Sequence, residues 1–112
     1  MTRNDAIGNV EIRNGYYKSG ALRLETPYVD GERHGIRKEY YESGALMTET
    51  PCVNGKEHGI VKTYYESGAI CREVPYVDGK KHGISRDYDN DNSNIYCLTL
   101  YNRDREVTSI KI

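Results

Sequence analysis

Apolar and polar residues alternate along much of this 112-residue chain, and turn-forming residues interrupt the alternation at regular intervals. In the segment 21–29, Leu22 and Leu24 alternate with Arg23 and Glu25, which is the period of two expected for a strand. Gly and Pro recur every few residues, and no apolar stripe with the 3.6-residue period of a helix is present. The pattern therefore predicts an all-β protein.

One unit of strands and turns recurs every 24 residues. The strand at 21–29 leads through a six-residue turn, 30–35, into a return strand at 36–41, and a short turn follows at 42–44. Columns of identical residues mark the period: Gly20, Gly44 and Gly68; Pro27, Pro51 and Pro75; His34, His58 and His82. A fixed period of this length indicates a repeat protein. We expect an elongated, single-layer antiparallel meander of repeated β-hairpins.

The repeats divide what we interpret as one domain into three parts. Residues 1–9 are expected to form a short leader, and residues 10–88 hold the repeats, which begin with a half unit. Residues 89–112 depart from the period and contain an apolar strand at 95–101 and a last strand at 106–112. Because terminal units must cover the open end of an array, we interpret 89–112 as a C-terminal capping hairpin.

The proline column falls late in a predicted strand. A proline cannot donate to the ladder, so it is normally tolerated only at an edge or a bulge. We therefore expect Pro27, Pro51 and Pro75 to mark a repeated bulge or strand end that adds twist, with a binding role as the alternative.

Composition identifies tyrosine as the main apolar mass of the fold. The chain has 11 Tyr and neither Phe nor Trp, with 16 basic residues, 17 acidic residues and a net charge of −1. Low hydrophobicity with so little net charge is not typical of disorder. A nucleic-acid-binding protein usually carries a basic excess, so none is predicted as a partner.

The cysteines and the apolar runs bear on the compartment. Cys52, Cys71 and Cys97 form no C-x-x-C motif, and their odd number argues against a disulfide framework. We expect them to be small buried or half-buried side chains in a reducing compartment. The first ten residues do not resemble a secretory signal, and no apolar run approaches the about 18 residues of a membrane span. The expected location is cytoplasmic.

No arrangement of side chains calls for an enzyme, a metal or a cofactor. Successive units lie two strands apart, roughly 9–10 Å, so the three histidines cannot easily share one ion. We expect the three histidines to be turn residues that make local hydrogen bonds. A pH-sensitive or binding column is the alternative. Ser43 and Ser67 lie at the opposite end of the strands from His58 and His82, about 20 Å away at about 3.3 Å per residue, so no serine nucleophile is predicted.

Two further sets of charged residues share a phase and are expected to neighbour each other across the strands. They are Glu25, Glu49 and Glu73, and Lys38, Lys62 and Arg86. Such a ladder contributes about 0.2–1 kcal/mol per pair. Its basic members would keep each carboxylate ionised, which does not suit a general acid. We interpret the set as a solvated ion-pair ladder.

The tyrosines are the candidate partner-binding residues. Adjacent strand residues point to opposite faces, so the two main columns should lie on different faces, and a single layer cannot hide both. Tyrosine is favoured at protein interfaces, although the rings could also simply stack as core. The candidate set is Tyr16, Tyr17, Tyr28, Tyr40, Tyr41, Tyr64, Tyr65, Tyr76 and Tyr88.

The repeated signature resembles the bacterial variant of the MORN repeat family. The residues that carry the resemblance are the Tyr-Tyr-x-Ser-Gly-Ala segment at 40–45, the Pro-Tyr-Val-Asp-Gly segment at 27–31 and the His-Gly-Ile triplets. The resemblance implies a single-layer sheet of hairpins, and some bacterial members are described as antitoxins of a toxin–antitoxin pair. It therefore implies a non-catalytic protein-interaction module, with a cognate toxin as a possible partner.

Two further interactions stay open at the level of sequence. A membrane-surface or lipid-binding role is the alternative function, supported by one basic turn, Gly79-Lys80-Lys81-His82. Two lysines give roughly 2 kcal/mol at an anionic surface, which is weak alone. The open edge strands of such a sheet would also allow a homodimer.

Overall fold

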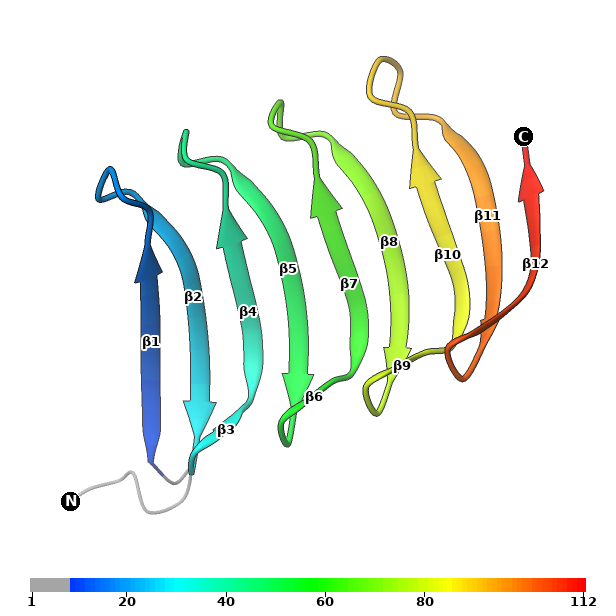
Figure 1. Cartoon of the computed structure of the whole chain (residues 1–112). Coiled ribbons are helices and arrows are strands. Elements are labelled where there is room, and N and C mark those ends of the chain that lie inside the picture. Colours follow the sequence, from blue (N-terminus) through cyan, green and yellow to red (C-terminus); the bar gives the residue numbers. More distant parts are fainter. Residues whose placement is uncertain (1–8) are drawn as a thin grey trace.

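The computed structural model describes residues 9–112, which form one open antiparallel sheet without a helix (Figure 1). The strands are β1 (Val10–Tyr16), β2 (Leu22–Val29), β3 (Glu32–Arg33), β4 (Gly35–Tyr40), β5 (Leu46–Val53), β6 (Lys56–Glu57), β7 (Gly59–Tyr64), β8 (Ile70–Val77), β9 (Lys80–Lys81), β10 (Gly83–Tyr88), β11 (Ile95–Asn102) and β12 (Arg105–Lys111). Residues 1–8 of the expected leader lie outside the described part.

The nine longer strands follow one another across the sheet in sequence order, and the short strands β3, β6 and β9 pair with β2, β5 and β8. The molecule measures 54 × 35 × 21 Å, with β1 at one edge and β12 at the other (Figure 1). The predicted thin meander of hairpins is confirmed. The two strands expected in the C-terminal segment also form, and β11 and β12 pair as the last hairpin.

The longer turn of the unit differs from the prediction. Residues 30–35 were expected to form a six-residue turn, but Asp30 and Gly31 alone reverse the chain, with φ of 50° and 83°. Glu32 and Arg33 then pair back onto β2 as β3. Asp-Gly favours φ > 0 at both central positions of a two-residue reversal, so the residues after it are free to continue the ladder.

Each proline lies where the ladder to the next strand is interrupted. β8 pairs with β9 at Tyr76 and Val77 and with β10 at Arg72 and Glu73, so the pairing breaks opposite Pro75. The proline carbonyl still accepts a hydrogen bond from the main-chain N–H of His82, at 3.0 Å. The predicted irregularity is therefore present, and it falls where a proline nitrogen has no proton to donate.

The glycine after each histidine fits against the proline ring of the preceding strand. Gly59 has a φ of 121°, and a Cβ added to it would lie 3.0 Å from Pro51 Cγ. The corresponding distances are 3.2 Å for Gly35 with Pro27 and 3.1 Å for Gly83 with Pro75. The Pro and His-Gly columns thus belong to one packing arrangement that the fold repeats.

The buried residues lie together on one face of the sheet, which we call the threonine face. They are Thr26, Thr50, Cys52, Val74, Ser85, Cys97 and Thr99. The register assigns them to a common face, since Ser85 pairs with Thr99 and Val74 with Val61. Their small side chains allow neighbouring residues to close over them, so a single layer acquires a thin core.

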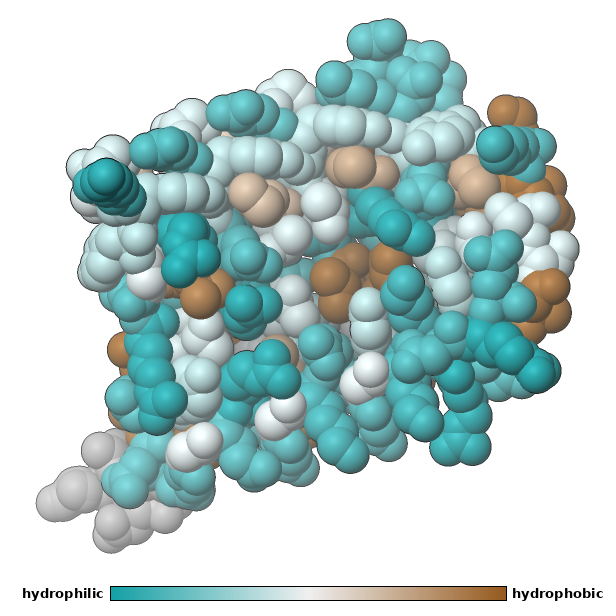
Figure 2. All heavy atoms as spheres, viewed as in Figure 1, coloured by the Kyte–Doolittle hydropathy of each residue, from teal (hydrophilic) through white to brown (hydrophobic). Residues whose placement is uncertain are grey.

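Figure 2 shows one face of the molecule as largely hydrophilic. Hydrophobic atoms show at a few separate places, among them a hollow near the centre of this face and the end at which β12 lies (Figure 2). Most of the buried side chains are small, so the core is narrow and the fold depends on the hydrogen-bonded backbone around it.

We predict that Gly59→Ala lowers the free energy of unfolding by about 2 kcal/mol, because it adds backbone strain and a close contact with Pro51. Gly68→Ala is the matched control. Gly68 has a φ of 97° but no neighbour within 4 Å of an added Cβ, so strain alone should cost about 1 kcal/mol. Urea denaturation measures both, and equal losses would show that the proline contact contributes nothing.

Candidate functional site

A column of isoleucines lies exposed on the face opposite the threonine face. Ile12, Ile36, Ile60 and Ile84 are 53%, 50%, 45% and 47% exposed, and they recur with the 24-residue period. Their cross-strand partners on the same face are Pro27, Pro51, Pro75 and Leu100. We call this surface the isoleucine face.

Most of the other exposed large hydrophobic side chains share this face. Alternation along the strands and the pairing register place these residues there: Val10, Val53, Val77, Tyr96, Leu100, Ile110 and Ile112. A contiguous apolar surface of this kind marks an interaction site more often than scattered apolar residues do. The isoleucine face is therefore the strongest candidate functional surface of the described residues.

The first tyrosine column lies on the isoleucine face, beside the glutamates. The hydroxyl of Tyr64 donates to Glu49 Oε1 at 2.6 Å, and that of Tyr40 donates to Glu25 Oε1 at 3.5 Å. Tyr88 donates in the same way to Glu73. These three rings are half-buried, whereas Tyr16, which begins the column, is 58% exposed.

The second tyrosine column lies in the short turns and links each unit to the next. The hydroxyl of Tyr41 donates to the main-chain oxygen of Tyr64 at 2.7 Å, and that of Tyr17 donates to Tyr40 O at 2.6 Å. Tyr65 repeats the contact with Tyr88 O at 2.7 Å. These side chains are half-buried and hold neighbouring hairpins together.

The remaining tyrosine candidates lie on the threonine face. Tyr28 is half-buried, with the guanidinium of Arg13 3.9 Å from its ring centroid. Tyr76 is also half-buried, and burial raises the pKa of its hydroxyl. The structure thus gives structural contacts to most of the nine predicted tyrosines, while their role in partner binding stays a prediction.

Sequence reasoning missed the isoleucine column, although its signal is visible. The third residue of each His-Gly-Ile triplet recurs every 24 residues, and Ile12 continues the column into the half unit. The tyrosine columns share the same period and are the more conspicuous signal in the sequence. Only the register shows that these isoleucines and the prolines stand side by side on one face.

The charged ladder lies on the isoleucine face, one row away from the isoleucines. Glu25 pairs with Lys38, and Glu49 pairs with both Lys38 and Lys62, as predicted. In the described part of the chain, however, no carboxylate lies within 4.0 Å of Lys38, Lys62 or Arg86. The predicted ion pairs are therefore not formed, because the glutamates accept tyrosine hydroxyls instead, and the cations stay available to other partners.

The histidines make hydrogen bonds between units. His58 Nδ1 accepts from the main-chain N–H of Asp78 at 3.3 Å, and His82 Nδ1 accepts from that of Arg103 at 3.3 Å. His34 lies 3.5 Å from Asn54 N in the same way. The interpretation of the histidines as hydrogen-bonding turn residues is confirmed.

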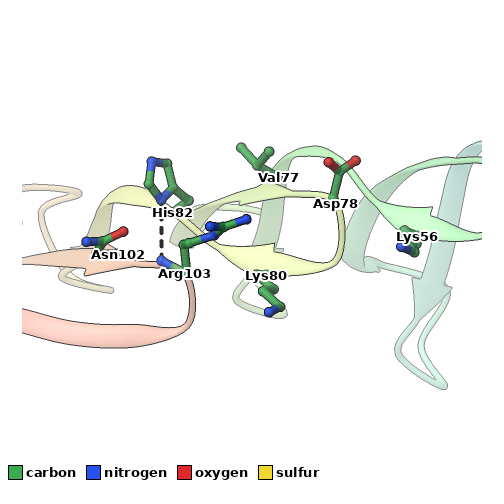
Figure 3. A pocket seen from close by; sticks show the side chains of 7 residues that line it. All are labelled: Lys56, Val77, Asp78, Lys80, His82, Asn102 and Arg103. Carbon is green, nitrogen blue, oxygen red and sulfur yellow. Dashed lines mark hydrogen bonds between the residues drawn. The ribbon is translucent and has the colours of Figure 1, made fainter.

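A hollow at the last turns is lined by side chains from three units of the array. Its lining residues are Lys56, Val77, Asp78, Lys80, His82, Asn102 and Arg103. Figure 3 shows these side chains spread along the turns rather than directed at one point, and the drawn hydrogen bond is that from Arg103 N to His82. The hollow therefore does not gather its cations into one anion site.

Other candidate chemistries can also be placed. Ser43 and Ser67 accept from the main-chain N–H groups of Ala45 and Ala69 at 3.4 Å. These serines lie in the turns before β5 and β8, at the opposite end of the strands from the His-Gly segments. Within residues 9–112, no group of three or more His, Cys, Asp or Glu residues is arranged to hold a metal. The same residues include no helix long and apolar enough to cross a membrane.

None of the three cysteines takes part in a disulfide. Cys52 and Cys97 are buried and Cys71 is half-buried, as predicted. Cys97 Sγ lies 3.4 Å from the Ser109 hydroxyl, which joins β11 to β12. Burial raises the pKa of the Cys52 thiol, so this side chain is the less reactive thiol form.

We predict that the fold loses stability as pH rises from about 10 to about 12. Burial and the hydrogen bond to Glu49 raise the pKa of Tyr64 from 10.0 to about 12, so the folded state favours the protonated phenol. This contribution is complete below the unfolded pKa and disappears as pH rises through the folded one. Tyr64→Phe should lessen the loss of stability over that pH range. Chemical denaturation across pH tests this, and identical profiles for Tyr64→Phe and the native chain would contradict it.

Comparisons with known proteins agree with this geometry. A family model described as "MORN repeat variant" matches residues 33–54 and 57–78. No curated protein matches the chain significantly in sequence. A structure titled "Crystal Structure of TarM" shares the fold with a TM-score of 0.58 and 13% identity over 96% of this chain, which spans 22% of that protein's length. Two consecutive units of the chain, residues 33–54 and 57–78, thus match the MORN repeat variant family.

Proposed function

We propose that this protein is a non-catalytic protein-interaction module whose isoleucine face is the binding surface. MORN repeats are generally protein- or membrane-binding modules, which agrees with this reading. The single observation that carries the proposal is the exposed column of Ile12, Ile36, Ile60 and Ile84 on a rigid, hydrogen-bonded sheet.

The geometry suits binding more than chemistry. The repeated side chains are displayed two strands apart, so like groups stay roughly 9–10 Å from one another and cannot converge on a reacting atom. Apolar side chains about half exposed on such a scaffold gain free energy when a partner covers them, at about 25 cal/mol per Å² of apolar area. Little ordering entropy is lost, because the backbone is already fixed.

A narrower form of the proposal is an antitoxin, which neutralises a toxin by stoichiometric binding. It is supported by the similarity of the repeat units to those of bacterial antitoxin-like members of the family. Three cysteines without a disulfide are consistent with action in the cytoplasm.

We predict that the protein captures a partner from an extract of its source cells and that Ile36→Lys/Ile60→Lys abolishes the capture. Two lysines in the centre of the apolar column would have to be desolvated on binding, which costs several kcal/mol. Glu11→Lys is the control, because Glu11 is exposed and lies on the threonine face. Capture that survives the double substitution would remove the isoleucine face as the binding surface.

We predict for the antitoxin form that co-expression relieves the toxicity of the product of the adjacent gene and that the two chains purify together. The same Ile36→Lys/Ile60→Lys variant should fail to rescue growth while it still folds, as judged by circular dichroism. Persistent toxicity with no complex would reject the antitoxin form and leave the general proposal standing.

A further inference from the structure

We propose that the occupant of the isoleucine face is a second copy of the same chain, which packs face to face to form a twofold-symmetric, two-layer sandwich. This inference rests on the proposal that the isoleucine face is an interaction surface, and it names the partner. It differs from a dimer formed through the open edges of the sheet. The observation behind it is the order of charges and apolar residues across the strands.

One row of this face alternates in charge from strand to strand. In sheet order the row reads Glu25, Lys38, Glu49, Lys62, Glu73 and Arg86. Six alternating charges have a special property. If the row is turned about a twofold axis that runs parallel to the strands, between β5 and β7, each charge meets its opposite.

The contacts of such a dimer follow from the strand order. Glu25 of one copy would face Arg86 of the other, and Glu49 would face Lys62. Lys38 would likewise face Glu73. An odd number of charges in the row would bring like charges together about any central axis, so this complementarity depends on the count. Self-complementarity of this kind is what an isologous interface requires.

The apolar row matches about the same axis. Ile60 would face Pro51 of the other copy, and Ile36 would face Pro75. At the ends of the row, Ile12 would face Leu100. A branched side chain therefore meets a compact ring along the row, an alternation of shape that suits the interdigitation of two sheets packed about 10 Å apart.

Among the described residues the cations of the ladder have no ion-pair partner, so a second copy could supply one. Lys38, Lys62 and Arg86 have no carboxylate within 4.0 Å among the described residues. Each facing glutamate already accepts a tyrosine hydroxyl, and a carboxylate has room for further donors. The second copy would thus supply counter-charges for groups that leave the solvent.

The size of the face is sufficient. The sheet extends over 54 × 35 Å, and a standard interface needs about 800 Å² from each partner. A second sheet would also cover the isoleucines, prolines and valines together. A second copy matches both the apolar row and the charge alternation beside it, whereas a membrane surface would match the apolar row alone.

A charge-swap experiment tests the inference. Light scattering after size exclusion should give twice the chain mass for the native protein. Glu25→Lys and Arg86→Glu should each give the mass of one chain, because the first brings a new lysine to Arg86 and the second brings a new glutamate to Glu25. An equimolar mixture of the two variants should regain the double mass, since the mixed dimer has one native contact between Glu25 and Arg86 and one contact in which the two charges are exchanged, and both are attractive.

Controls separate folding from association. Glu11→Lys, on the threonine face, should stay dimeric, and Ile60→Lys should be monomeric with the circular dichroism spectrum of a folded sheet. Two variants that fail to associate when mixed, or a native dimer insensitive to Ile60→Lys, would overturn the inference. A native chain that is monomeric yet captures a partner through the isoleucine face would also overturn it while the proposed function stands. A monomer that captures nothing would defeat both.

Discussion

Hydrogen bonding between successive hairpins is the interaction on which this structure depends. A sheet one layer thick has almost no interior, so apolar burial cannot supply the usual share of the stability. Backbone ladders join β4 to β5 and β7 to β8 along most of their length, whereas neighbouring hairpins share only two register positions, as between β5 and β7. Side chains add links between hairpins at both ends of the strands. At one end of the strands the Tyr41 hydroxyl donates to the main-chain oxygen of Tyr64, and at the other end His58 accepts from the main-chain N–H of Asp78. Each unit therefore depends on its neighbours for polar partners as well as for packing.

The last hairpin keeps this linkage although its sequence has diverged from the repeat. The main-chain N–H of Asp104 donates to Lys81 O at 2.7 Å, as that of Gly79 donates to Glu57 O at 2.8 Å one unit earlier. The Asp104 carboxylate also accepts from Lys81 N. Without a His-Gly segment, β12 runs beside β11 over most of its length, so the array ends in a regular strand.

Segregation of side chains between the two faces links the fold to the proposed function. Small residues such as Thr50 and Ser85 let the threonine face close over itself. The larger isoleucines then remain on the other face, where no layer formed by residues 9–112 covers them. A sheet that completes only one of its faces has a free energy to gain from a partner. The alternating charges beside the isoleucines limit which partner fits.

The sequence by itself determined the unit and its period. Alternation, Asp-Gly turns and the repeated glycines specify hairpins through local conformational preferences, so the all-β meander was predictable, as was the placement of the Glu and Lys columns on neighbouring strands. The tight turn at Asp30 with its short third strand was not, because pairing of Glu32 and Arg33 depends on contact with β2.

Only the tertiary structure decided which side chains are used up within the fold and which remain free. The sequence predicted exposed tyrosine columns, but the distances between units show that the hydroxyls of Tyr17 and Tyr64 donate hydrogen bonds to neighbouring hairpins. The exposed apolar surface is formed instead by side chains such as Ile36 and Ile60. The physical reason is that exposure depends on register and on contacts between units, which a period along the chain does not contain.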